Sequence, residues 1–142
     1  MYKSILVSVD LNDANSWNKA LPTAVELCQS FGCELHVIAV IPDVGMSMVG
    51  AYFPADFADK AIEGARVKLH ALLDTELPDG VKAQAIVAQG TIYHEILQTA
   101  ERIAADLIIM ASHRPGLADY LLGPNAARVV RHAKLSVLVV RN

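Results

Sequence analysis

The sequence lacks the features that mark several large classes of protein. No apolar run reaches the roughly 18 residues that a membrane-spanning helix needs, so no transmembrane segment is expected. Residues 1–7 enter a strand pattern directly and show no cleavage-site signature, which predicts a cytoplasmic protein. The net charge of −3 provides no basic excess, and a nucleic-acid partner is therefore not expected. With 54% hydrophobic and 19% charged residues, the composition excludes disorder.

The sequence also lacks several motifs of nucleotide binding and catalysis. It contains neither G-x-G-x-x-G after the first strand pattern nor G-x-x-x-x-G-K-[ST], which excludes an ordinary dinucleotide fingerprint and a P-loop. Ser8 and Ser112 lack the flanking glycines of a nucleophile elbow. The five histidines are scattered without metal-site spacing. Cys28 and Cys33 lack C-x-x-C spacing, and we expect them to be buried structural thiols. No catalytic residue and no metal ligand is predicted.

Apolar strand patterns alternate with helical periodicity along the chain, which predicts one domain over residues 1–142. Strict alternation indicates an open, Rossmann-like α/β sheet of five parallel strands with helices on both faces. Residues 81–87 alternate polar with apolar side chains, as is typical of a sheet edge, and this favours the strand order 3-2-1-4-5. The expected strands are residues 5–9, 35–41, 81–87, 107–110 and 136–140.

In that order the first and fourth strands are neighbours at the point where the connections diverge to opposite faces of the sheet. Ligands of open α/β sheets bind at the carboxyl ends of such strands. Polar residues follow both strands: Ser8 and Asp10 at the first, and Ser112, His113 and Arg114 at the fourth. We therefore expect these residues to meet at one site.

Residues 110–126 are the most informative segment for function. A buried strand pattern ends there, a polar and basic loop follows, and a helical pattern then begins at a glycine. Free backbone N–H groups and the helix dipole converge at such a helix start, which makes it a common place to hold an anion.

The last strand pattern indicates an association between copies of the chain. Residues 136–140 are apolar and β-branched, yet the expected order puts them at a sheet edge, where an exposed apolar strand is an aggregation hazard. We predict that a second copy of the chain covers this edge. The alternative is that Arg141, Asn142 and a neighbouring helix shield it.

Several segments together resemble the universal stress protein family. They are ILVSVD at residues 5–10, VIPD at 40–43, and Gly-x-Asn-Ala-x-x-Val-Val-Arg-His-Ala-x-x-Ser-Val-Leu-Val-Val at 123–140. Ala-Ser-His-Arg-Pro followed by Tyr-Leu-Leu-Gly is most similar to the F/G-type branch of small bacterial members. The resemblance covers essentially the whole chain. It implies a homodimer through the strand Ser136–Val140, or a higher oligomer, and in many members ATP bound at the switch point of the sheet.

The chain departs from the pattern of the ATP-binding members, which is Gly-x-x-Gly, nine residues, then Gly-Ser or Gly-Thr. Ala111 stands at the first glycine, the second is missing before Arg114, and Pro124 follows Gly123. The lost glycines remove positions where the backbone could approach phosphates at positive φ. Pro124 offers neither a hydroxyl nor an N–H group, although it suits the first turn of a helix. Arg114 and Asn125 are the candidate replacement donors.

The resemblance implies a role for each position of the site. Asp10 and Val40 would lie near the base and ribose, Met110 and Ala111 would form the floor, and the later residues would surround the phosphates. The implied ligand is ATP, with AMP or ADP as alternatives, together with Mg²⁺. The residues expected to bind it are Ser8, Val9, Asp10, Val40, Met110, Ala111, Ser112, His113, Arg114, Gly123, Pro124, Asn125 and Ala126.

The sequence thus favours a nucleotide-binding stress or signalling module. ATP hydrolysis is expected to be slow at most, because no carboxylate is evidently placed to act as a general base beside the phosphates. The alternative is a nucleotide-free dimeric adaptor. Its pocket would be closed by Ala111 in place of glycine and by Pro124 in place of serine. A third hypothesis is a small hydrolase or transferase that uses His113. Each polar residue also has a plain structural interpretation: Asp10 as a helix cap, His113 as a loop histidine and Arg114 as a solvated charge.

Overall fold

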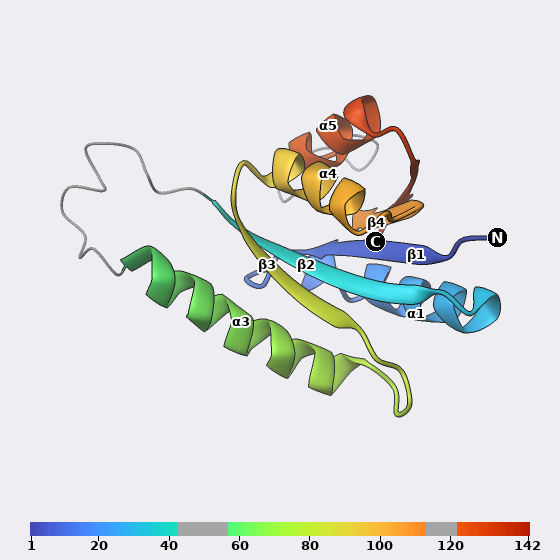
Figure 1. Ribbon diagram of the computed structural model, residues 1–142, viewed down its shortest axis with the longest axis horizontal. Coiled ribbons are helices and arrows are strands. Elements are labelled where there is room, and N and C mark those ends of the chain that lie inside the picture. Colours follow the sequence, from blue (N-terminus) through green and yellow to red (C-terminus); the bar gives the residue numbers. More distant parts are fainter. Residues whose placement is uncertain (43–56, 113–121) are drawn as a thin grey trace.

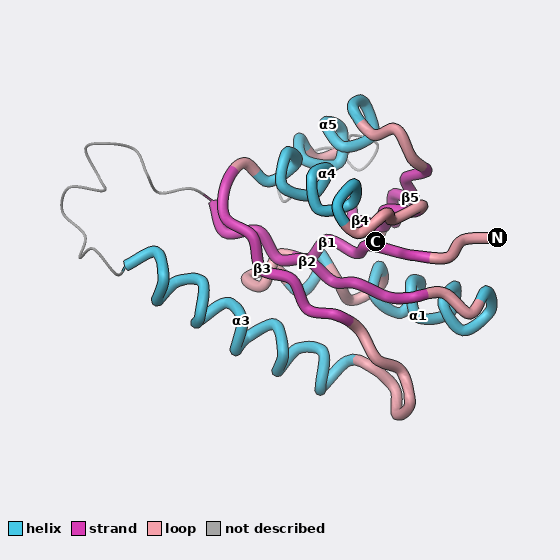
Figure 2. Tube along the Cα trace, viewed as in Figure 1, coloured by secondary structure: helices cyan, strands magenta, loops and turns pink. Residues whose placement is uncertain are grey.

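The computed structural model describes residues 1–42, 57–112 and 122–142. Its strands are β1 (Ser4–Val9), β2 (Glu34–Pro42), β3 (Gln84–Gly90), β4 (Leu107–Ala111) and β5 (Ser136–Val140). Its helices are the 3₁₀ turn η1 (Ala14–Ser16), α1 (Ala20–Phe31), α3 (Phe57–Glu76), α4 (Ile92–Arg102) and α5 (Pro124–His132). The strands form one sheet in the order β3-β2-β1-β4-β5, and all neighbouring pairs are parallel (Figures 1 and 2). The predicted fold class and strand order are confirmed.

The sheet separates two hydrophobic cores. Helices α1 and α3 cover one face, and α4 and α5 cover the other (Figure 1). Successive side chains of a strand point to opposite faces, so Ile5 and Val7 of β1 join the α1–α3 core while Leu6 joins the α4–α5 core. Because all three are fully buried, β1 must be apolar on both faces. The unbroken apolar run at residues 5–9 is therefore the sequence signature of a central strand.

Two element boundaries differ from the predicted ones. The helical spacing of apolar residues from Trp17 to Phe31 predicts a first helix that begins near Trp17. The helix begins instead at Ala20, because Asp13 caps the preceding turn η1 by accepting a hydrogen bond from the Asn15 amide at 3.0 Å. Strand β3 begins at Gln84 rather than at residue 81, because Val81 still belongs to the preceding turn. Its amide donates to the Pro78 carbonyl at 3.1 Å.

Asp106 connects the start of β4 to the start of β1 through hydrogen bonds. Its carboxylate oxygens accept hydrogen bonds from the amides of Lys3 at 2.9 Å and Ser4 at 3.1 Å, and its own amide donates to the Ser4 carbonyl at 2.9 Å. Burial raises the pKa of this carboxyl, but the backbone hydrogen bonds to its charged form outweigh that effect and lower the pKa below its ordinary value.

We expect Asp106→Asn to lower the free energy of unfolding at neutral pH by about 1 kcal/mol, because one backbone N–H loses its acceptor. A depressed pKa contributes stability above the ordinary aspartate pKa and loses it as the pH falls. The difference between wild type and variant should therefore shrink below about pH 4. Urea unfolding across a pH series measures it. If the difference in free energy of unfolding between the wild type and Asp106→Asn stays constant down to acidic pH, the charge of Asp106 does not contribute to its hydrogen bonds with the backbone.

Among the described residues, no helix combines the length and the apolar content needed to cross a membrane.

Candidate functional site

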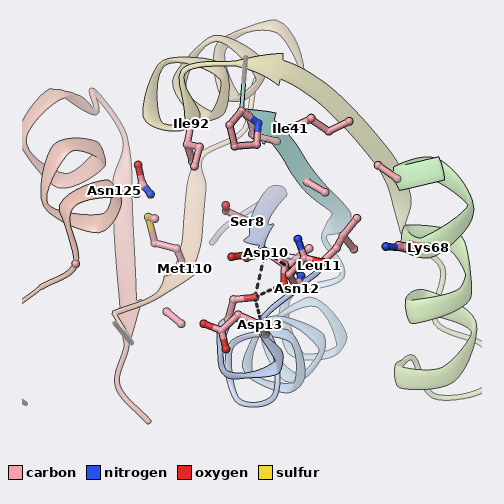
Figure 3. A pocket seen from close by; sticks show the side chains of 18 of the residues that line it. Ser8, Asp10, Leu11, Asn12, Asp13, Ile41, Lys68, Ile92, Met110 and Asn125 are labelled. Atoms are coloured by element: carbon pink, nitrogen blue, oxygen red, sulfur yellow. Dashed lines mark hydrogen bonds between the residues drawn. The ribbon is translucent and has the colours of Figure 1, made fainter. Parts of the chain in front are cut away.

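A cleft of about 750 Å³ opens at the carboxyl ends of β1, β2 and β4 (Figure 3). This is the switch point of the sheet, where the connection from β1 crosses one face and the connection from β4 crosses the other. The turn after β1, helix α3, and the first residues of α4 and α5 complete the walls. The volume falls within the range typical of small-molecule sites, about 300–1,000 Å³.

Most of the residues predicted to bind a ligand line this cleft. The structure brings together Ser8, Val9, Asp10, Val40, Met110, Ala111, Gly123, Pro124, Asn125 and Ala126.

The other predicted site residues lie elsewhere or cannot be placed. Ser112 is buried outside the lining of the cleft, and its amide donates to the Val140 carbonyl at 3.0 Å. That N–H group is therefore engaged with β5 rather than directed at a ligand. His113 and Arg114 lie outside the described residues.

The turn after β1 forms a polar wall held by its own hydrogen bonds. The Asp10 amide donates to Ser16 Oγ at 2.7 Å, and the Ser16 hydroxyl donates to the Asp13 carbonyl at 2.7 Å. Asp10 Oδ1 accepts from the Asn12 amide at 2.9 Å, so part of its role is to stabilise this turn. Oδ2 of Asp10 accepts no hydrogen bond from the described residues, and the carboxylate is exposed at the edge of the cleft. The carboxylate can therefore accept hydrogen bonds from a ligand.

The start of α5 forms the opposite wall. Gly123 precedes the helix in an extended conformation, and Pro124 occupies the first helical turn, where its missing N–H costs no intrahelical bond. No side chain of the described residues caps this end of the helix. The amides of Asn125 and Ala126 belong to the first turn and so lack intrahelical acceptors. With the helix dipole they make a site that favours negative charge.

Helix α3 supplies a wall that the sequence analysis did not include. Ala61, Gly64, Ala65 and Lys68 recur at helical spacing and line the cleft together. The three small side chains occupy little of the cleft, which leaves space for a ligand beside α3. The Lys68 amino group is directed from α3 toward the turn after β1 (Figure 3). The signal was present in the sequence as a stripe of small residues at i, i+3 and i+4 that ends in lysine at i+7.

Apolar side chains from three elements also line the cleft. Val40 and Ile41 come from the end of β2, Ile92 from the start of α4 and Met110 from the end of β4. Polar groups lie at either side, on the turn after β1 and on α5. In the part of the chain that the structure describes, no three histidine, cysteine or acidic residues gather as a metal site. The cleft therefore suits an organic ligand with a flat apolar portion and an anionic end.

Comparison with known proteins identifies the family. The sequence model of the universal stress protein family matches residues 1–141. The chain belongs to the universal stress protein family. Universal stress protein G from Shigella flexneri is 32% identical over 145 residues, and the match covers 99% of this chain and 100% of that protein. The resemblance found in the sequence is confirmed.

Solved structures share the same fold. The structure of hypothetical protein MJ0577 matches with a TM-score of 0.75 and 27% identity, covering 100% of this chain and 97% of that one. A universal stress protein in complex with cAMP matches with a TM-score of 0.61 and 20% identity, covering 99% and 97%. The universal stress protein from Archaeoglobus fulgidus in complex with dAMP matches with a TM-score of 0.63 and 18% identity, covering 99% and 98%.

Proposed function

We propose that this protein binds an adenine nucleotide, ATP with Mg²⁺, in the cleft at the ends of β1, β2 and β4. One observation carries the proposal: the uncapped start of α5, the polar turn after β1 and the apolar ends of β2 and β4 all face a single cleft. These surfaces match the phosphates, the ribose and the base of a nucleotide, in that order. The protein would act as a cytoplasmic stress or signalling module.

The phosphates are assigned to the start of α5. The amides of Asn125 and Ala126 offer N–H donors without intrahelical acceptors, and the Asn125 side chain, which lies at the cleft, offers a further N–H₂ group. Gly123 lets the backbone come close because it has no side chain. Pro124 contributes no donor, so this cluster is weaker than one with serine or threonine at the same position.

The base and ribose are assigned to the ends of β1 and β2. Val40, Ile41 and Met110 provide apolar surface for a planar base. Asp10 offers a carboxylate oxygen to the ribose hydroxyls, since its other oxygen is engaged with the Asn12 amide. Lys68 projects into the cleft from α3 as a cationic donor near the same end.

The ligands of related structures support an adenine nucleotide as the class. Two proteins of the same fold were solved with cAMP and with dAMP, which are both adenine nucleotides with a single phosphate. At 20% and 18% identity these proteins share the fold with this chain, so the choice among ATP, ADP and AMP rests on the cleft. Its volume of about 750 Å³ accommodates a nucleoside triphosphate.

Magnesium would enter with the nucleotide and be held mainly by its phosphates and by water. Mg²⁺ keeps several waters and needs only one or two protein carboxylates, so the lack of a three-ligand cluster among the described residues is consistent with this mode. Asp10 and Asp13 line the side of the cleft opposite α5 and are engaged in the turn after β1. We assign no catalytic residue, and hydrolysis of ATP would be slow at most.

We further propose a homodimer through β5, or a higher oligomer built from it. This strand is a sheet edge among the described residues, and Leu138 on it is 37% exposed. Lys19 Nζ donates to the Arg141 carbonyl at 2.8 Å, and the Asn142 side chain donates to the Asn15 carbonyl at 2.6 Å, which holds both residues toward the start of α1. An exposed apolar edge strand is best covered by a second copy.

Displacement of a fluorescent ATP analogue tests the proposed ligand class. We expect ATP, ADP and AMP each to displace the analogue completely, with ATP the tightest because it places the most charge at α5. Ribose 5-phosphate, which lacks the base, should bind at least about tenfold more weakly than AMP, because it makes no contact with the apolar walls of the cleft. Failure of all three nucleotides to displace the analogue would favour the nucleotide-free adaptor.

A further inference from the structure

Two cysteines lie side by side where α1 ends and β2 begins. Gly32 adopts a left-handed conformation at φ 68°, and its amide and that of Cys33 both donate to the Cys28 carbonyl, at 2.8 and 3.2 Å. This tight reversal brings the Cys33 Sγ atom to 3.2 Å from the Cys28 Sγ atom. Both thiols are free. The expectation that both are buried holds only for Cys28, because Cys33 is half-buried.

The two thiols differ in reactivity. Burial raises the pKa of Cys28 to about 12, and the neighbouring Cys33 adds to the shift through its hydrogen bond and its charge. Cys28 therefore stays protonated and is a poor nucleophile on its own. Cys33 is only half-buried and is therefore the thiol of the pair that a small oxidant reaches more easily. The pair thus combines a less buried thiol with a protected one in contact with it.

We propose that Cys28 and Cys33 form a reversible oxidation site, which a hydroperoxide converts into an intramolecular disulfide. Nothing about this site depends on the proposed nucleotide. Disulfides in proteins of reducing compartments are usually transient and redox-sensing, which is the behaviour expected here.

The reaction balances in two steps. The Cys33 thiolate attacks the peroxide, an S–O bond forms while the O–O bond breaks, and the departing oxygen takes a proton to leave as water or an alcohol. Cys28 then attacks the sulfur of the resulting sulfenic acid. An S–S bond forms, the S–O bond breaks, and hydroxide leaves as water with the Cys28 proton. The two thiols lose two protons and two electrons in total, and the peroxide gains them.

The geometry favours the second step. The sulfurs need to approach from 3.2 Å to a bond length of about 2.0 Å, and both belong to one tight turn.

The cysteine pair lies at the opposite end of the sheet from the cleft. Cys33 immediately precedes β2, whereas the cleft is lined by the last residues of that strand, and Figure 1 shows the turn between α1 and β2 far from the carboxyl end of β2. We therefore expect oxidation to leave nucleotide binding unchanged. The two proposals can fail independently of each other.

Intact-mass spectrometry of the whole protein tests the site. After treatment with hydrogen peroxide and alkylation in denaturant, the wild type should be lighter by two hydrogens and carry no alkyl group. Treatment with dithiothreitol should restore both alkylation sites. A product with added oxygen atoms on Cys33 and an alkylated Cys28 would overturn the proposal, as would two thiols that stay fully alkylatable.

Two matched variants assign the roles. In Cys28→Ser, Cys33 should still react with peroxide but accumulate oxygen atoms instead of losing hydrogens, because no second thiol is present. In Cys33→Ser, Cys28 should react at least about tenfold more slowly than the wild type, because it is buried and protonated. Circular dichroism checks that both variants are folded. Equal oxidation rates of Cys33→Ser and the wild type would contradict the assignment of Cys33 as the attacking thiol.

Discussion

Asn125→Asp is expected to stabilise the protein and weaken ATP binding at the same time. The residue is in the first turn of α5, which contains no acidic side chain and no side-chain cap from the described residues. A carboxylate there interacts favourably with the helix dipole, which is worth about 0.3–1 kcal/mol. The same charge, placed near a phosphate, opposes binding by about 2 kcal/mol, roughly a 30-fold loss of affinity. Thermal unfolding and calorimetric titration measure the two effects on the same sample.

Asn18→Asp is the matched control. It makes the same chemical change and the same change in net charge, but Asn18 is exposed before α1 and is not among the residues that line the cleft. We expect its affinity for ATP to stay within about twofold of the wild type, since an exposed charge at a distance is screened. If Asn125→Asp raises the melting temperature and binds ATP as tightly as the wild type, the phosphates do not lie at α5.

If the proposed dimer forms through β5, Leu138→Lys is expected to convert it into a monomer at micromolar concentration. Leu138 is the most exposed large apolar side chain of β5, at 37%. In a symmetric interface the substitution occurs twice. Each lysine either buries its charge in the interface or keeps the surrounding apolar surface exposed to water. A cost of about 1 kcal/mol per copy weakens the dimer roughly 30-fold. Sedimentation velocity over a concentration series follows the change.

Val67→Lys is the control for this substitution. Val67 is also a large exposed apolar residue, at 61%, but it lies on α3 and not on the edge strand. The variant should sediment as the wild type does. If Leu138→Lys forms as much dimer as Val67→Lys, the interface does not include Leu138.

The strand order could be read from the sequence because burial on each strand differs. The apolar run around Leu6 and Val7 requires helices on both faces, and both residues are fully buried between the two cores. Residues 84–90 lie at the edge beside β2, where none of them is fully buried.

Local turns were harder to predict. The Asp13-capped turn η1 replaces the first helical turn expected near Trp17, because a short polar side chain can cap a turn earlier than the apolar period suggests.

The candidate site was predictable where it depends on strand ends and much less so elsewhere. Asp10, Val40 and Asn125 reach one cleft because parallel strands end at the same edge of the sheet. Lys68 was missed because its place depends on how α3 packs, with Leu69 and Leu73 buried against the sheet, and such packing joins residues distant in sequence. For Ser112, the strand pattern alone did not reveal that its amide pairs with β5.

Calorimetric titration with ATP and Mg²⁺, performed on the wild type and on Pro124→Ser, measures whether the cleft binds the nucleotide. Serine at this position restores an N–H and a hydroxyl at the start of α5, so Pro124→Ser should bind about tenfold more tightly, and Pro124→Ala, which restores only the N–H, should fall between. We expect saturable heat for the wild type with one nucleotide per chain. No heat from the wild type, together with binding by Pro124→Ser, would contradict it and leave a dimeric adaptor with a degenerate cleft.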